Sequence, residues 1–121
     1  HLGKDHFEFA DNVRILAHAV ALGARHGVPI HVETHRGRAC HTAATTAAYL
    51  RAAPGLTLTA DFSHFTCVSE SDLADQPHHV APCVAATRHV HARVGCDQGP
   101  QVPDPESPHF ARWTEVFLGF W

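Results

Sequence analysis

The sequence has no methionine, a single tyrosine and no apolar run near the roughly 18 residues that a membrane-spanning helix requires. No membrane association is therefore expected. The nine lysine and arginine residues are scattered, and the formal net charge is −3 with histidine neutral. Because non-specific nucleic-acid binding depends on clustered positive charge, nucleic acid is not an expected partner.

Signals for export and for cysteine-based sites are also missing. No signal peptide is visible, and the chain begins without methionine, as the interior of a longer protein would. None of the four cysteines forms a C-x-x-C pair, which argues against a zinc ribbon or a thioredoxin-type motif. These observations predict a reduced, cytoplasmic compartment.

Histidine is the residue type in excess, with 13 copies among 121 residues. Its imidazole binds metals and titrates near neutral pH, so this enrichment favours metal or proton chemistry, although several histidines must simply lie on the surface. The hydrophobic share of 45% is that of an ordinary globular protein. We therefore expect one small folded domain over residues 1–121.

Periodicity predicts alternating helices and strands. Asp5-His6-Phe7-Glu8 has the form of a capping box, which predicts a helix to about His26, with Gly27 as its stop. Alternating apolar and polar residues predict three strands, over 28–35, 56–62 and 88–95. Further helices are expected over 42–53, over 80–87 with Pro82 in the first turn, and from Ser107-Pro108 to Trp121. Residues 63–79 read as a loop with a helical turn near 69–74.

The resulting αβαβαβα order is typical of a parallel sheet with right-handed crossovers. Each predicted strand has one apolar and one polar face, and the polar residues gather toward its C-terminal end: Glu33 and His35, then Asp61, then His91 and Arg93. Active sites of α/β barrels and sheets lie at this end of the strands. The alternative is a one-sided sheet with a solvated face, but such faces usually carry Lys, Glu and Thr rather than this set.

Glu33, Asp61 and His91 are the candidate metal ligands. Two carboxylates and an imidazole from adjacent strands can converge on one divalent ion, and mixed oxygen and nitrogen donors suit Mn²⁺, Mg²⁺, Co²⁺ or Zn²⁺. Such an ion polarises a carbonyl and stabilises an enediolate. Two alternatives remain open: Glu33 as an ion-pair partner of Arg36 or Arg93, and Asp61 as a cap for residues 63–65.

Other candidates lie around these three residues. His64 follows Asp61 by three positions and could hydrogen-bond a substrate hydroxyl or join the coordination shell. Arg36, Arg38 and Arg93 lie near the same rim and are candidates for holding a phosphate or carboxylate group. His89, placed deeper than His91 along the strand, reads as a hydrogen-bonded interior histidine rather than a ligand.

Three segments resemble the sugar phosphate isomerase/epimerase group of the xylose-isomerase-like TIM barrels: HVETHRGR (31–38), LTADFSHF (58–65) and HVHARVGCDQGPQVPDP (89–105). The resemblance implies an α/β fold that is part of a (β/α)₈ TIM barrel, about strands 4–6 with flanking helices. Endonuclease-IV-type repair enzymes belong to the same superfamily.

The resemblance also implies residue roles. In this superfamily a metal is held by a Glu after the fourth strand, an Asp after the fifth, a His after the sixth and a Glu after the eighth. The first three match Glu33, Asp61 and His91, and the substrate- or metal-contacting His after the Asp matches His64. In ketose epimerases the first and last Glu are the acid/base pair, which makes Glu33 an implied proton carrier.

The chain departs from the family by its extent. A full barrel takes roughly 250 residues, so this chain is about half of one and lacks the fourth ligand. Open sheet edges invite pairing, so we expect another chain or the missing barrel half to cover them.

The function expected is therefore a metal-dependent isomerase or epimerase acting on a small sugar or sugar phosphate. One alternative is a non-catalytic barrel remnant that serves as a structural or interaction subunit. The other is an endonuclease-IV-like abasic-site DNA hydrolase, which the acidic composition disfavours.

Overall fold

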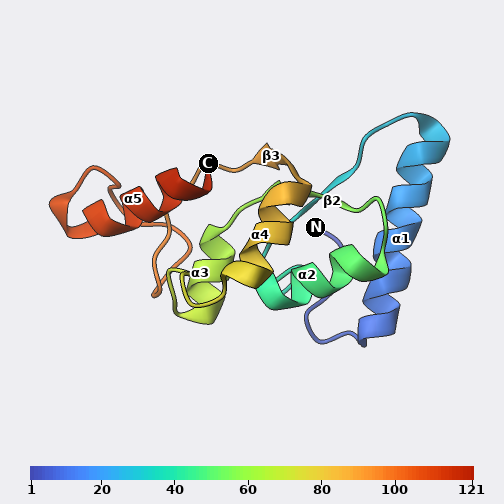
Figure 1. The fold of residues 1–121 in the computed structure, drawn as a ribbon, viewed down its shortest axis with the longest axis horizontal. Coiled ribbons are helices and arrows are strands. Elements are labelled where there is room, and N and C mark those ends of the chain that lie inside the picture. Colours follow the sequence, from blue (N-terminus) through green and yellow to red (C-terminus); the bar gives the residue numbers. More distant parts are fainter.

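The computed structural model describes residues 1–121 as three parallel strands with helices between them (Figure 1). The strands are β1 (His31–Glu33), β2 (Thr57–Ala60) and β3 (Thr87–Val90), and they lie side by side in the order β1-β2-β3. The helices are α1 (Phe9–His26), α2 (Ala43–Ala52), α3 (Ser63–Ser69), α4 (Pro77–Ala86), the 3-10 helix η1 (Pro108–Phe110) and α5 (Ala111–Phe120). The predicted parallel α/β arrangement is confirmed.

The strands are shorter than the alternation predicts, but the backbone pairing continues beyond them. The Thr34 N–H donates to the Thr59 carbonyl at 3.1 Å, and the His91 N–H donates to the Ala60 carbonyl at 2.9 Å. The residues just after β1 and β3 are therefore held by the sheet. An irregularity in the β2–β3 register lies between Leu58 and Thr59.

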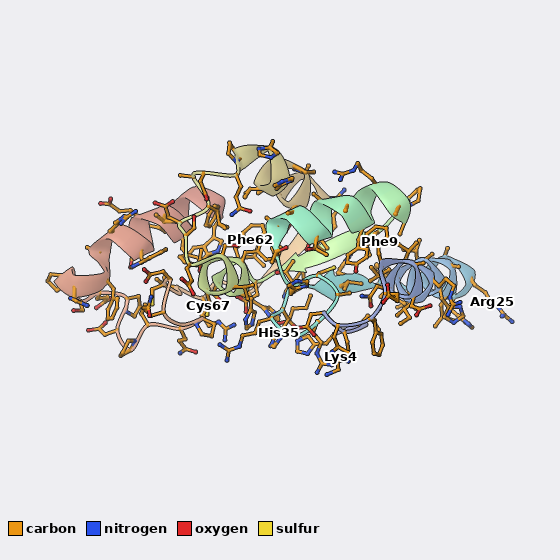
Figure 2. All side chains as sticks on the ribbon, turned by 90° about the horizontal axis from the view of Figure 1, so that it is seen from below. Lys4, Phe9, Arg25, His35, Phe62 and Cys67 are labelled. Carbon is orange, nitrogen blue, oxygen red and sulfur yellow. The ribbon has the colours of Figure 1, made fainter.

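The hydrophobic core lies where the helices pack on the sheet. Leu58 and Ala60 of the central strand are almost completely buried, and they share one core cluster with Val32 of β1, Leu16 of α1 and Ala47 of α2. This confirms the predicted apolar face of the central strand and, in the first strand, the inward position of Val32; Val28, predicted on the same face, is 57% exposed because it lies before β1 begins. Figure 2 shows the consequence: His35 lies on the side of the molecule away from α2.

The first helix begins later than predicted. Its N-cap is Glu8 rather than Asp5, and no side chain caps it. The Asp5 carboxylate instead accepts the backbone N–H of His6, so the capping box does not form. The predicted end is correct, because Gly27 adopts a left-handed conformation with φ of 65° and closes the helix.

The region between β2 and β3 is more helical than predicted. Residues 63–69 form α3, where the sequence predicts a loop. The next helix begins at Pro77, so Pro77 occupies the first turn and Pro82 lies inside α4, contrary to prediction. A proline at the start of a helix loses no intrahelical hydrogen bond, and this favours the earlier start.

β3 forms one edge of the sheet and is poorly covered. It ends at Val90 rather than near Gly95, so His91 and Arg93 lie just beyond it. Val90, on the predicted apolar face of this strand, is 38% exposed. His89 is also exposed, so its predicted interior position is wrong; no strand lies on the outer side of β3 to bury either residue.

The chain forms an open arc, with α1 at one end and α5 at the other (Figure 1). α5 is attached through aromatic contacts: Phe117 is fully buried, and the Phe62 and Phe120 rings lie 5.3 Å apart. None of the helices combines the length and apolar character needed to cross a bilayer.

Candidate metal centre

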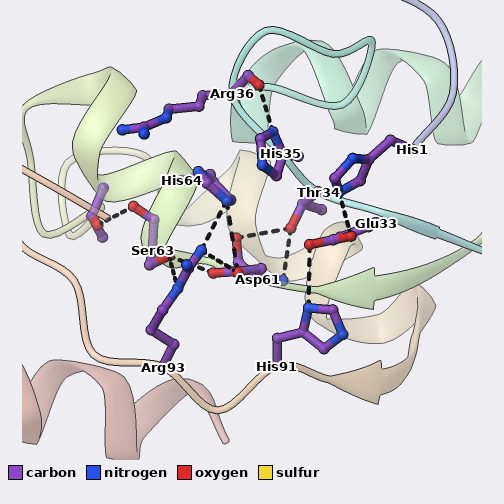
Figure 3. Close-up of polar contacts among 11 residues, drawn as sticks. His1, Glu33, Thr34, His35, Arg36, Asp61, Ser63, His64, His91 and Arg93 are labelled. Atoms are coloured by element: carbon purple, nitrogen blue, oxygen red, sulfur yellow. Dashed lines mark hydrogen bonds and ion pairs between the residues drawn. The ribbon is translucent and has the colours of Figure 1, made fainter. Parts of the chain in front are cut away.

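Glu33, Asp61 and His91 meet at one edge of the sheet. Glu33 is the last residue of β1, and Asp61 and His91 are the first residues after β2 and β3. Because the three strands are parallel neighbours, their C-terminal ends coincide in space. One ligand atom from each side chain lies within 4.8 Å of those of the other two. The structure thus brings together the three side chains that the sequence pattern selected (Figure 3).

Thr34 fixes the first two of these residues relative to each other. Its hydroxyl donates to the Asp61 carbonyl at 2.9 Å and accepts the Asp61 N–H at 2.8 Å. Thr34 is completely buried and Asp61 nearly so. The Thr34 side chain therefore takes the place of a backbone hydrogen bond between the two strands, and it links the ends of β1 and β2 beside Asp61.

Glu33 presents an accessible carboxylate between two imidazoles. Its Oε2 lies 2.5 Å from His1 Nε2, and its Oε1 lies 3.2 Å from His91 Nδ1. The Glu33 side chain is 20% exposed, and that of His91 is 44% exposed. The alternative of an ion pair with Arg36 or Arg93 is not realised, since the partners of Glu33 are histidines.

Asp61 presents a buried carboxylate whose charge is compensated. Its side chain is 3% exposed, its Oδ1 accepts the Ser63 hydroxyl, and its Oδ2 lies 2.5 Å from Arg93 Nη2. A buried carboxylate needs such partners, because desolvation without them costs several kcal/mol. The alternative of a helix cap is not realised: the side chain binds a hydroxyl and a guanidinium, and the N-cap of α3 is Phe62.

His64 lies beside Asp61 and is neutral at neutral pH. Its Nε2 accepts from Arg93 Nη2 at 2.9 Å and lies 3.7 Å from Asp61 Oδ2. Burial, together with the neighbouring His35 and Arg93, lowers the pKa of His64 to about 4. An accepting Nε2 places the ring proton on Nδ1, which is buried without a hydrogen-bond partner.

The three arginines proposed for an anionic group differ in their surroundings. Arg93 is committed to Asp61, Ser63 and His64. Arg36 lies close enough to His64 to affect its pKa, and neither Arg36 nor Arg38 forms a salt bridge. Figure 3 shows Arg36 at the rim above His64, next to His35. Arg38 belongs to the same loop.

Sequence reasoning missed three residues that organise the site: His1, Thr34 and Ser63. Thr34 and Ser63 stand inside the E-T-H and D-F-S-H motifs, so their position was a usable signal. His1 contacts Glu33 and lies 4.3 Å from the His35 ring between centroids, and nothing local in the sequence indicates this. Gly95 contributes as well, since a Cβ there would lie 2.8 Å from the Ser63 Cβ.

The donor set fits a divalent cation. Two carboxylates and an imidazole have ligand atoms close enough to share one ion, and the cationic guanidinium of Arg93 already contacts Asp61 at this point. Mixed oxygen and nitrogen donors of this kind suit Mn²⁺, Mg²⁺, Co²⁺ or Zn²⁺.

Comparison with known proteins identifies the fold. No protein-family model and no curated protein matches the chain. A solved structure does: the probable 3-DHS dehydratase AsbF involved in petrobactin synthesis, from Bacillus anthracis, with a TM-score of 0.61 and 20% identity. The match covers 89% of this chain and 39% of that chain. The chain has the fold of part of a TIM barrel, as predicted.

Replacing Thr34 by valine tests how the site is held. Thr34→Val keeps the shape but leaves the buried Asp61 N–H without its partner and leaves the Asp61 carbonyl with only the longer bond from the His64 N–H, so we expect a loss on the order of 1–3 kcal/mol in the free energy of unfolding. Urea unfolding measures it. The matched control is Thr46→Val, because the Thr46 hydroxyl is equally buried but bonds no backbone group. Equal losses in both variants would contradict this account of Thr34.

Proposed function

We propose that this chain supplies three protein ligands, Glu33, Asp61 and His91, to a divalent-metal centre of a sugar or sugar phosphate isomerase or epimerase. The observation that carries the proposal is the convergence of the three side chains at the C-terminal edge of a parallel sheet. That edge is where TIM-barrel enzymes bind and convert their substrates. The resemblance of the surrounding motifs to the isomerase/epimerase group adds the substrate class.

A divalent cation bound there would polarise the substrate carbonyl and stabilise an enediolate. Three protein ligands leave coordination positions open for substrate oxygens, as a catalytic site requires. The fourth ligand that the family resemblance implies is not among these 121 residues, so binding by this chain alone is expected to be weaker than in a complete barrel.

Burial assigns different roles to the two carboxylates. Asp61 is enclosed and accepts hydrogen bonds from Ser63 and Arg93, whereas Glu33 is partly exposed at the edge of the site. A general base must reach the proton that it removes, so Glu33 is the proton carrier in this proposal. His91 Nδ1, at 3.2 Å from Glu33, holds the carboxylate in place.

We assign the anionic group of a substrate to the arginines of the loop after β1. Arg36 is exposed and free of salt bridges, and it lies on the loop that comes after the Glu33 strand. Arginine forms paired hydrogen bonds to phosphate or carboxylate oxygens. Arg38, from the same loop, is the second candidate. The family resemblance implies that His64 contacts a substrate hydroxyl; its Nε2 is held by Arg93 in this structure, so that role requires the Arg93 contact to open.

The open edges of the sheet are assigned to a covering partner, either another chain or the remainder of the barrel. β1 and β3 each have one unpaired side, and the residues of β3 from Arg88 to Val90 are exposed. Unpaired edges attract further strands. The match to only 39% of the AsbF chain supports this proposal.

A dehydratase is the second candidate function. The solved structure that shares this fold is a probable 3-DHS dehydratase. Elimination of water from a hydroxylated carbonyl compound also begins with removal of a proton beside the carbonyl. The same carboxylate and cation would therefore serve either reaction, and the two candidates differ only in the step after proton removal.

Metal titration of the purified chain tests the ligand assignment. After treatment with a chelator, we expect the chain to bind one equivalent of Mn²⁺ in calorimetry and the double variant Glu33→Gln, His91→Ala to bind none. The control variant, Glu115→Gln with His109→Ala, removes the same residue types from exposed positions on α5 and η1 and should bind like the wild type. Absence of Mn²⁺ affinity in the wild type, and also in a variant in which Arg93 no longer pairs with Asp61, would instead support the structural-remnant alternative.

Deuterium exchange separates the two reactions. With Mn²⁺ in D₂O, we expect exchange at the carbon beside the carbonyl of a ketose or its phosphate, without loss of mass by dehydration, detected by NMR and mass spectrometry. Glu33→Gln should abolish the exchange, because the proton carrier is removed. Loss of one water from 3-DHS, with no exchange on any ketose, would reverse the order of the two candidates.

A further inference from the structure

Arg93 contacts Asp61 directly instead of lying free at the rim. Its Nη2 lies 2.5 Å from Asp61 Oδ2 and 2.9 Å from His64 Nε2, and its Nε donates to the Ser63 hydroxyl at 3.2 Å. One guanidinium thus engages the acidic candidate ligand and the two polar side chains beside it (Figure 3). Arg93 is the arginine that contacts Asp61, and its 2.5 Å approach is much closer than the 3.7 Å between Asp61 Oδ2 and the other basic neighbour, His64.

This contact is needed only while no other cation lies on Asp61. An enclosed carboxylate requires a counter-charge, and Arg93 supplies it. A divalent ion ligated by Asp61 Oδ2 would lie within a few ångströms of the guanidinium, where two positive charges in a partly desolvated site repel each other strongly. The guanidinium and the ion therefore compete for the same carboxylate.

The Arg93 side chain has room to move away from Asp61. Its side chain is 32% exposed and belongs to the segment after β3 rather than to the strand itself. Arg93 also lines an open cavity of about 540 Å³, together with Gln101, Glu106, Thr114 and Trp121. Glu106 is exposed and lines the same cavity, so it is the candidate acidic partner for a guanidinium that leaves Asp61.

We propose that Arg93 is a displaceable internal counter-cation: it neutralises Asp61 until a divalent cation binds, and it thereby lowers the metal affinity of the site. The proposal rests on the proposed function, because it concerns the same ligand set. It makes Arg93 a positioning residue that acts through Asp61. On displacement, His64 Nε2 loses its donor as well, so metal binding also frees this imidazole for a substrate hydroxyl.

Mn²⁺ affinity of three variants tests the proposal. We expect Arg93→Ala and Arg93→Gln to bind Mn²⁺ more tightly than the wild type, on the order of tenfold, because the competing charge is gone. Gln keeps the hydrogen-bonding capacity without the charge, so it serves if the alanine variant does not fold. The matched control, Arg88→Ala, removes the same charge from β3, where Arg88 contacts only backbone carbonyls, and should leave the affinity unchanged.

The outcomes separate this proposal from the proposed function. If the wild type binds Mn²⁺ and the Arg93 variants bind it equally or more weakly, the counter-cation proposal is overturned while the ligand assignment stands. If neither wild type nor variants bind Mn²⁺, both fail. Binding by the Arg93 variants alone supports the proposal in its strongest form, with Arg93 blocking the site in the isolated chain.

Stability in the absence of metal provides a second readout. With the chelator present, Arg93→Ala leaves the Asp61 carboxylate buried without its counter-charge, so its urea midpoint should fall below those of the wild type and Arg88→Ala. Saturating Mn²⁺ should remove most of that difference, because the ion replaces the lost charge. A midpoint equal to that of Arg88→Ala under both conditions would overturn the role assigned to Arg93.

Discussion

Parallel pairing of β1, β2 and β3 is the constraint on which the site depends. Three short strands that run in the same direction must end at the same edge, and each ends in or just before a residue with a metal-ligating side chain. The Thr34 hydroxyl and the His91 N–H extend the ladder by one rung on each side of β2. Glu33, Asp61 and His91 are thereby held by backbone geometry, and no loop has to close to assemble them.

Burial then separates the roles of chemically similar groups. Asp61 is enclosed among Ser63, His64 and Arg93, whereas Glu33 stands at the edge between two histidines. In the proposed function the enclosed carboxylate would anchor a cation, and the partly exposed one would carry a proton. Arg93 stabilises the enclosed Asp61 carboxylate when no ion is bound, and in the proposal above it leaves this carboxylate when an ion binds.

Much of this arrangement can be predicted from sequence, because alternation along a strand directly sets which side chains share a face. The segment 56–62 is predicted in this way, and with it the burial of Leu58 and the position of Asp61. The predicted boundaries of helices are wrong in two places. The Asp5 carboxylate does not cap α1, which begins later, and α3 forms where the sequence predicts a loop. The contact of Arg93 with Asp61 depends on how the segment after β3 folds back over Ser63, which periodicity does not encode.

β3 is exposed because it is an edge strand, with β2 on one side and no strand on the other. In a closed barrel every strand has two neighbours, but β3 has one, so Val90 and His89 lie in solvent. The core beneath α2 and α4 is nevertheless continuous, and it carries the site residues on strands that are buried on their helical side. The sheet edge that carries Glu33, Asp61 and His91 is consequently held by this core, although the rest of the structure is open.

Anomalous diffraction from a crystal of the chain soaked in Mn²⁺ tests the central claim most directly. We expect a single strong peak within coordination distance of Glu33, Asp61 and His91, with the Arg93 guanidinium moved away from Asp61 toward Glu106. A peak elsewhere, or none at these three side chains while Arg93 keeps its contact, would contradict it.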